Sequence, residues 1–554
     1  MWQKPPGVNG DSALVRVGLP ALRPDEGACP QRRSLKSRPL VGSSGDGWRP
    51  SPVEDFWFAP AEHLIDAAEF PGERRRRRGS AVVAPAHEEW GRQAARIFLG
   101  ARERFLKEQE VLGSSRAIPV LDRWVASRSV DDVPGVHTYE LEVWGRQYAT
   151  SDGSIRELWI PHLSQLKPTR PLSELAAAAG VLVYGRPCDT SSYKAARVPI
   201  EPAASVPERV RIIGFGLGDG QVRVLAAEED GRQADWTAQE ARDLFNRHAA
   251  PLITPATSGS ERRPGDGCVD CKVLPVCPEL PRTRGLLSVV DPAPGRRKRR
   301  TVSVSDLRAF KECPARYHLT RTLNLRERAP EPEWIRRGRA VDAWLNERHA
   351  DADRLPCRHA PLPETLPGLT AGELAPALAM LRQHRSRCPF DRLDPRDRCL
   401  PQQRITVYDD EADVVVIADC DLLYTERGAA VIRETKTTSH CYGTGQEVME
   451  RHPQLALAVL FLATGTVPGD PHRSRVELEV LRPDGSAEEE LDPFDPATLT
   501  QARAVVRTLV DPWIRAVTYP EAPRDGYDCG QCEAHKWCAT GQDRMKGRRG
   551  EERP

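Results

Sequence analysis

Eight of the 14 cysteines fall into two sets that follow the same pattern. Each set opens with a lone Cys-Pro and closes, far along the chain, with Cys-x2-Cys-x5-Cys. Four thiolates in this arrangement can hold a metal centre, and such a centre would join the two ends of one domain. The repetition therefore predicts one domain written twice. The sets are Cys29, Cys268, Cys271 and Cys277, and Cys313, Cys529, Cys532 and Cys538.

Two acidic residues and a lysine lie between the cysteines of the second set. We expect strands at 414–424 and 429–437, joined by a short glycine-containing turn. Side chains two residues apart share a strand face, so Glu434 and Lys436 should point the same way. Asp421 on the preceding strand can lie opposite them. The pattern predicts that two carboxylates and one amine converge.

This trio is suited to metal-assisted hydrolysis of a phosphodiester. Asp421 and Glu434 supply hard oxygen ligands for Mg²⁺ or Mn²⁺, which would polarise the phosphate and lower the pKa of a bound water. Lys436 can orient that water, help to deprotonate it, or stabilise the charge that builds up on phosphorus. A surface hairpin with an ordinary salt bridge is the alternative interpretation.

The surrounding elements must bring distant residues to these strands. Ser305 is expected to cap a helix that leads to Cys313, and a second helix is expected over 334–349. Further along, we expect helices at 453–464 and 498–517, the latter leading to the second cysteine triplet.

The phrase Asp421-x12-Glu434-x-Lys436 resembles the core of the PD-(D/E)XK nuclease superfamily. More specifically, 302–540 resembles the RecB-type branch that carries a 4Fe–4S cluster, to which the helicase–nuclease AddB and the CRISPR-associated Fe–S exonucleases belong. The order of the parts carries this resemblance more than any single part.

Three helical motifs extend the resemblance. Val304 to Pro314 is similar to the opening helix of the branch, Gly338 to Asp342 to its G-x-x-x-H helix, and Gln454 to Ala458 to its Q-x-x-x-Y helix. Asp342 replaces the family's histidine, which is a metal ligand, and Ala458 replaces its tyrosine. By the resemblance, the catalytic residues are Asp421, Glu434, Lys436 and Gln454, the Mg²⁺ or Mn²⁺ ligands are Asp342, Asp421 and Glu434, and the 4Fe–4S ligands are Cys313, Cys529, Cys532 and Cys538.

Spacing alone does not separate a 4Fe–4S cluster from Zn²⁺ held by four thiolates. The resemblance favours the cluster, in a structural role that clamps the C-terminal segment onto the first helix. For the first set, a second cluster and a local zinc knuckle without Cys29 both remain open. The other cysteines are expected to be core or surface thiols; they are Cys188, Cys357, Cys388, Cys399, Cys420 and Cys441.

The first half is expected to be a degenerate copy of the same domain. Aligning Ile155-Arg156-Glu157 with Ile432-Arg433-Glu434 places Trp159 where Lys436 stands, and Glu140 or Glu142 near the position of Asp421. An indole has one neutral donor and no charge, so it cannot replace an ammonium group. We therefore expect a nuclease-like domain that has lost its active site.

The expected fold class is α/β, with a restriction-endonuclease-like core in which a mixed central sheet is flanked by helices. The core is expected to be duplicated and to carry a C-terminal Fe–S staple. The expected divisions are an irregular tail at 1–28, the degenerate domain at 29–280, a basic Pro/Gly linker at 281–301, the nuclease domain at 302–540 and a charged tail at 541–554.

Composition adds limits. The net charge of +1 gives no global attraction to nucleic acid, so any such surface must be local. The arginine-rich run at 296–300 is a better candidate for DNA phosphates than the run at 74–78. No long apolar run or signal core is visible, so we expect a cytoplasmic protein without a membrane partner.

The function expected is a metal-dependent DNA nuclease, acting as an exonuclease on single strands or ends in DNA repair, recombination or phage defence, with DNA and a helicase subunit as partners. The alternative is a non-catalytic Fe–S or Zn DNA-binding or scaffold subunit. An Fe–S redox sensor that regulates transcription is a third reading, weakened by the lack of a recognisable helix-turn-helix.

Overall fold

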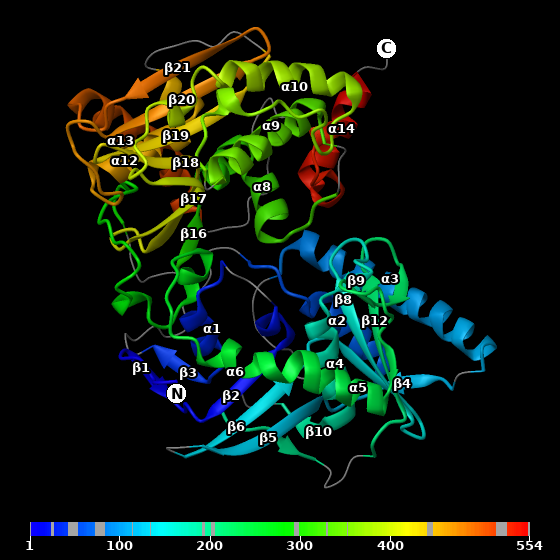
Figure 1. Cartoon of the computed structure of the whole chain (residues 1–554). Helices are drawn as coiled ribbons and strands as arrows, with labels where there is room; N and C mark the ends of the chain where they lie inside the picture. Colours follow the sequence, from blue (N-terminus) through cyan, green and yellow to red (C-terminus); the bar gives the residue numbers. More distant parts are fainter. Residues whose placement is uncertain are drawn as a thin grey trace.

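The computed structural model describes residues 2–551 except 24–26, 43–53, 73–82, 114, 133–134, 191–193, 201–204, 293–297, 328–330, 352, 440–446 and 517–528. The two halves of the chain form separate sheets with their own helices, and Figure 1 shows the second half, coloured green to red, above the first. Both halves are mixed α/β structures. In the described part of the chain, no helix is long and apolar enough to cross a membrane.

The second half is built on one six-stranded mixed sheet. Its order is β16-β18-β19-β20-β21, and β17 also pairs with β18. β18 and β19 are antiparallel, whereas β19 and β20 are parallel. The strands are β16 (Arg300–Val302), β17 (Cys399–Asp409), β18 (Val414–Glu426), β19 (Ala429–Thr437), β20 (Arg475–Arg482) and β21 (Gly485–Leu491).

Helices flank this sheet. α12 (Pro453–Ala463) is apolar all round and packs against β19 and β20, which explains why nearly all of its side chains are buried. α9 (Glu333–Ala350) packs against β17 and β19, and α10 (Ala371–His384) against β20 and β21. The other helices are α7 (Val304–Glu312), α8 (Pro314–Tyr317), α11 (Val448–Arg451), α13 (Pro496–Arg515) and α14 (Ala539–Glu551).

α7 begins two residues earlier than expected. Its N-cap is Ser303, not Ser305, because the Ser303 hydroxyl accepts the Asp306 N–H at 3.2 Å and the Asp306 carboxylate accepts the Ser303 N–H at 3.1 Å. This reciprocal capping box satisfies two free backbone donors at once.

Among its described residues, the first half holds two larger sheets and two small ones. Their orders are β11-β10-β5-β6-β2, β13-β12-β8-β7-β4 with β15 on β12, β1-β3, and β14-β9. The strands are β1 (Val8–Gly10), β2 (Leu14–Gly18), β3 (Leu40–Gly42), β4 (Ala117–Pro119), β5 (Trp124–Asp132), β6 (Gly135–Glu142), β7 (Arg146–Thr150), β8 (Ile155–His162), β9 (Thr169–Arg170), β10 (Arg186–Asp189), β11 (Val198–Pro199), β12 (Arg209–Gly216), β13 (Val222–Val224), β14 (Ala226–Ala227) and β15 (Asp235–Thr237).

Its helices surround a core that includes the buried α4. They are α1 (Pro30–Lys36), α2 (Ala59–Glu69), α3 (Pro85–Val111), α4 (Leu172–Tyr184), α5 (Ala238–Leu244) and α6 (Ala250–Ser258). The expected irregular tail at 1–28 instead contains β1 and β2. β2 runs parallel to β6 and buries Val15 and Val17, so this apolar segment forms part of the sheet.

The segment between the halves is partly ordered against the second half. The Asp409 carboxylate on β17 accepts the N–H groups of Gly285, at 3.1 Å, and of Leu287, at 2.8 Å. The expected linker at 281–301 therefore ends inside the sheet, as strand β16.

Candidate active site

Asp421, Glu434 and Lys436 lie together on the neighbouring strands β18 and β19. The Lys436 ammonium donates to Glu434 Oε2 at 2.9 Å and to Asp421 Oδ2 at 3.3 Å. The regular backbone pairing of β18 with β19 ends at Leu422 and Arg433, one step short of the site. Beyond it, Asp421 Oδ2 accepts the Thr435 N–H at 2.8 Å, so this carboxylate replaces a backbone partner and is held in place.

α9 brings a third carboxylate. The helix approaches the end of β19 closely at Gly338, where an added Cβ would lie 2.8 Å from Thr437 Oγ1. Glycine therefore permits the contact, and Asp342 follows one turn later. Its Oδ2 accepts from Asn346 Nδ2 at 3.1 Å.

The electrostatics place Asp342 with the trio. Burial, then the charge of Asp421, raises the pKa of Asp342 to about 6, while Lys436 opposes the shift. Burial also raises the pKa of Glu434 to about 7 against the pull of Lys436. Burial lowers the pKa of Lys436, but the charges of Glu434 and Asp421 outweigh it, so the net pKa lies above its ordinary value. Negative charge is thus concentrated here with one cation, a setting suited to a divalent metal ion.

The start of α12 carries the remaining predicted residue, Gln454, and a histidine that was not predicted from the sequence. Gln454 is half-buried in the first turn of this helix. His452 precedes the helix, and burial together with the positive charges of Lys436 and Arg308 lowers its pKa to about 4. A neutral imidazole therefore stands near the Lys436 ammonium at neutral pH; its position two residues before Gln454 was the signal available in the sequence.

The second half of the chain is similar to a known protein family. Residues 301–539 match the family model described as the PD-(D/E)XK nuclease superfamily. These residues form a domain of that superfamily. No curated protein matches the chain. A solved structure titled "Crystal structure of SSO0001" is similar at 15% identity, over 44% of this chain and 86% of that one, with a TM-score of 0.23.

The nuclease domain also brings its four predicted cysteines together. Cys313, Cys529, Cys532 and Cys538 line one small pocket. Burial, with a smaller contribution from neighbouring sulfurs, raises the pKa of Cys532 and of Cys538. Crowded, buried thiolates repel one another, so this donor set fits a bound cationic centre.

The first cysteine set converges in the same way, Cys29 included. Cys29, Cys268, Cys271 and Cys277 line a second pocket, and burial raises the pKa of Cys271 to about 11. The two lone cysteines are alike in detail, since each caps a short helix that begins with proline. Cys29 Sγ accepts the Arg32 N–H and Cys313 Sγ accepts the Arg316 N–H, both at 3.4 Å.

Each cysteine loop packs near the other half of the chain. Cys268 and Leu274 share a hydrophobic cluster with Tyr408 and Val415 of the nuclease domain. In return, Cys532, Trp537 and Cys538 pack against a cluster that contains Trp90 and Phe98 of the first half.

In the first half, β8 occupies the place that β19 has in the nuclease domain. β8 is antiparallel to β7 and parallel to β12, as β19 is to β18 and β20. Trp159 Nε1 donates to Glu157 Oε2 at 3.0 Å, which parallels the Lys436 bond to Glu434.

The expectation that Glu140 or Glu142 matches Asp421 is wrong. Both lie on β6, in a different sheet, and the residue opposite Glu157 is Tyr148. Trp159 is fully buried among aromatic rings, so an indole in an apolar core stands at the strand position that the Lys436 ammonium has in the second half. The surrounding rings are Phe98, Phe105, Tyr148 and Phe215.

Two other sequence expectations have different outcomes. The described end of the basic run at 296–300 is engaged within the chain: Arg299 pairs with Asp413 at 2.6 Å, and Arg300 lies 3.8 Å from the Trp513 ring centroid. The run at 74–78 lies outside the described residues. Cys357 and Cys388, expected to be plain thiols, lie in a buried group with His349 and His384.

Proposed function

We propose that the chain is a metal-dependent DNA nuclease whose active site is in the second half. The convergence of Asp421, Glu434 and Lys436, with Asp342 beside them, carries this proposal. Asp342, Asp421 and Glu434 would hold Mg²⁺ or Mn²⁺, which when bound polarises a phosphate and lowers the pKa of a water. Asp342 in place of histidine makes the donor set entirely oxygen, a composition that favours Mg²⁺.

The side chains of the site have separate tasks. The Thr435 N–H and the Lys436 ammonium hold the Asp421 carboxylate in position. Lys436 is 30% exposed, so it can reach a substrate phosphate while it remains paired to Glu434. There it would orient the attacking water and stabilise negative charge on phosphorus. Gln454 and His452, at the start of α12, offer neutral polar groups for positioning the substrate.

We propose that Cys313, Cys529, Cys532 and Cys538 hold a 4Fe–4S cluster and that the first set holds a second one. The clustering of each set around one pocket supports this assignment, with zinc as the alternative occupant. The cluster in the nuclease domain would join the segment before α14 to the start of α8. The site of the first half, filled by Trp159, would be inactive.

The finer role follows from the resemblance to the RecB/AddB branch. We propose an exonuclease that acts on DNA single strands or ends, in the cytoplasm, in repair, recombination or phage defence beside a helicase subunit. A chain with two metal-bound halves, one of them without catalytic residues, suits attachment to such a partner.

A cleavage assay tests the activity. Labelled single-stranded and blunt-ended DNA is incubated with the full chain and Mg²⁺ or Mn²⁺, and Lys436→Ala and Asp421→Asn are compared with wild type. Asp419→Asn is the matched control, because Asp419 lies on the same strand two residues away but is exposed and pairs with Arg404 at 2.6 Å. Wild type and the control should cut, and the two site variants should not.

An inert wild type, or a Lys436→Ala protein that cuts as fast as wild type, would contradict the nuclease proposal. Anaerobic purification followed by iron and sulfide analysis tests the clusters separately. A colourless protein that contains only zinc would contradict the Fe–S assignment.

A further inference from the structure

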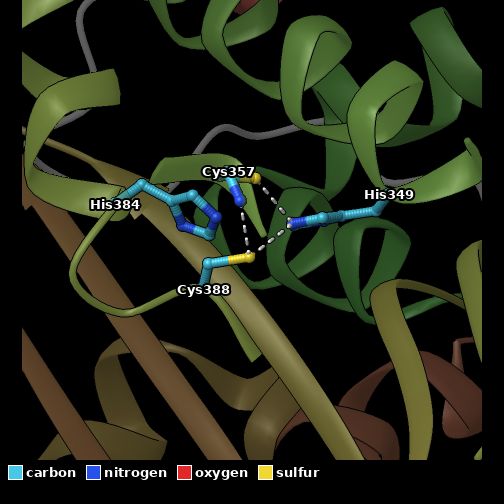
Figure 2. A group of neighbouring side chains, drawn as sticks. All are labelled: His349, Cys357, His384 and Cys388. Carbon is cyan, nitrogen blue, oxygen red and sulfur yellow. Dashed lines mark hydrogen bonds between the residues drawn. The ribbon is translucent and has the colours of Figure 1, made fainter. Parts of the chain in front are cut away.

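Two histidines and two cysteines face one another inside the helical layer of the nuclease domain (Figure 2). His349 is in the last turn of α9, Cys357 opens the short 3-10 turn Cys357–His359, His384 ends α10, and Cys388 follows in the next loop. All four side chains are buried, from 0% exposure for Cys357 to 6% for His349. The group shares no residue with the two cysteine sets or with the carboxylate site, which consists of Asp342, Asp421, Glu434 and Lys436.

The distances fit a tetrahedral ion. One ligand atom from each residue lies within 4.8 Å of all the others. His349 Nε2 is 3.6 Å from Cys357 Sγ and 4.0 Å from Cys388 Sγ. With Zn–N and Zn–S bonds of ordinary length, a tetrahedral site separates nitrogen from sulfur by about 3.6 Å and two sulfurs by about 3.8 Å.

The hydrogen bonds of His384 leave one of its ring nitrogens available to bind a metal ion. Its Nδ1 donates to the Glu479 carboxylate, at 2.9 Å and 3.0 Å from the two oxygens. A carboxylate on one ring nitrogen fixes the tautomer and leaves a lone pair on the other, as is usual for metal-bound histidine. That other atom, Nε2, is buried and has no hydrogen-bond partner among the described residues. An unpaired buried nitrogen is costly unless something binds it.

We propose that His349, Cys357, His384 and Cys388 bind one Zn²⁺ ion as a closed structural site. Two imidazoles and two thiolates form a donor set that zinc prefers, and four protein ligands leave no position for substrate. The apolar surroundings exclude water: Cys357 and Cys388 belong to a core cluster with Val341, Leu345 and Leu381.

The ion would fix α9 and α10 against the face of the sheet that lies opposite Glu434 and Lys436. Glu479 Oε2, besides holding His384, lies 3.4 Å from Arg433 Nη2 and 3.5 Å from Thr435 Oγ1. Those residues point to the face of β19 opposite Glu434 and Lys436. α9 runs from Asp342 to His349 in about two turns, so fixing its end also positions Asp342. This positioning role rests on the proposed nuclease function; zinc binding itself does not.

Metal content of the full chain tests the proposal. The numbers of zinc and iron atoms per chain are measured by elemental mass spectrometry for wild type, Cys357→Ala and Cys388→Ala. The control is Cys399→Ala, because the Cys399 thiol lies beside the group, with Sγ 3.9 Å from the His349 carbonyl oxygen, but outside it. Both ligand variants should lose one zinc equivalent and keep their iron, and the control should lose neither.

A milder variant covers the case in which the ligand variants do not fold. Glu479→Gln keeps all four ligands, and loss of this second-shell acceptor should raise the zinc dissociation constant about 10- to 100-fold in chelator competition. Zinc content that is equal in all folded variants, an unchanged dissociation constant in Glu479→Gln, or a Cys357–Cys388 disulfide in the wild-type chain would overturn the site. Loss of zinc with unchanged DNA cleavage would overturn only the positioning role.

Discussion

Metal binding at the carboxylate site should depend steeply on pH. A protonated carboxyl group cannot ligate a cation, and the pKa is raised to about 7 for Glu434 and to about 6 for Asp342. As pH falls through these values, protons compete with the metal ion, whereas above pH 8 both groups are ionised. Lys436 stays charged over this range, since its pKa lies above the ordinary value.

The size of the effect follows from two independent protonations. Between pH 8 and pH 6 the apparent affinity for Mn²⁺ should fall about 20-fold, or about 1.8 kcal/mol, and by pH 5 about 1,000-fold. In Asp342→Asn only Glu434 titrates, so the loss between pH 8 and pH 5 should shrink to about 90-fold. The Asp419→Asn control should follow the wild-type curve, because Asp419 lies on the surface away from the site.

Mn²⁺ titrations followed by electron paramagnetic resonance of the free ion would measure these affinities at each pH. An affinity that is flat between pH 8 and pH 6 would refute the argument, because it would mean that Glu434 is already ionised without the metal. Equal curves for wild type and Asp342→Asn would remove Asp342 from the ligand set.

Three further outcomes are expected. Lys436→Met should lower the turnover number for DNA cleavage about 100- to 1,000-fold with little change in KM, because the ammonium acts mainly in the transition state; unchanged turnover would exclude it. Cys532→Ser should remove the iron of one cluster only, so that about half of the wild-type iron remains on analysis, and a full complement would contradict its assignment. Trp159→Ala should lower the free energy of unfolding of the first half by about 3–5 kcal/mol in urea titrations, because it empties a closed aromatic core; a much smaller loss would show that the indole is not needed there.

Local patterns predicted well what depends on neighbours in sequence. The two strand segments at 414–424 and 429–437, joined by a glycine-containing turn, predicted the hairpin that brings Asp421 to Glu434 and Lys436. The 338–342 motif indicated the helix that carries Asp342, and the structure adds that its glycine lies against Thr437 of β19. Patterns failed where pairing partners lie far apart in the chain. Glu140 was aligned with Asp421 as its first-half counterpart by counting residues, but β6 pairs with β5 and β2, in a different sheet from β8.

The buried group of two histidines and two cysteines was not predicted from the sequence, for a related reason. His349, Cys357, His384 and Cys388 come from two helices and two connecting segments, and their spacing matches no short metal motif. Cysteines in the middle of a domain are most often core residues, so nothing local distinguished these two from the rest.

The sequence by itself determined the chemistry available: eight cysteines in two repeated sets, and an acidic pair with one lysine in only the second repeat. It also determined that the first repeat carries Trp159 where an ammonium would be needed. Only the tertiary structure decided which groups meet. The packing of α9 against β19 placed Asp342 at the carboxylate site, and the packing of α9 and α10 over the sheet joined four distant ligands behind it. Such contacts depend on how whole elements bury their apolar faces, and that is a property of the folded chain, not of any short segment.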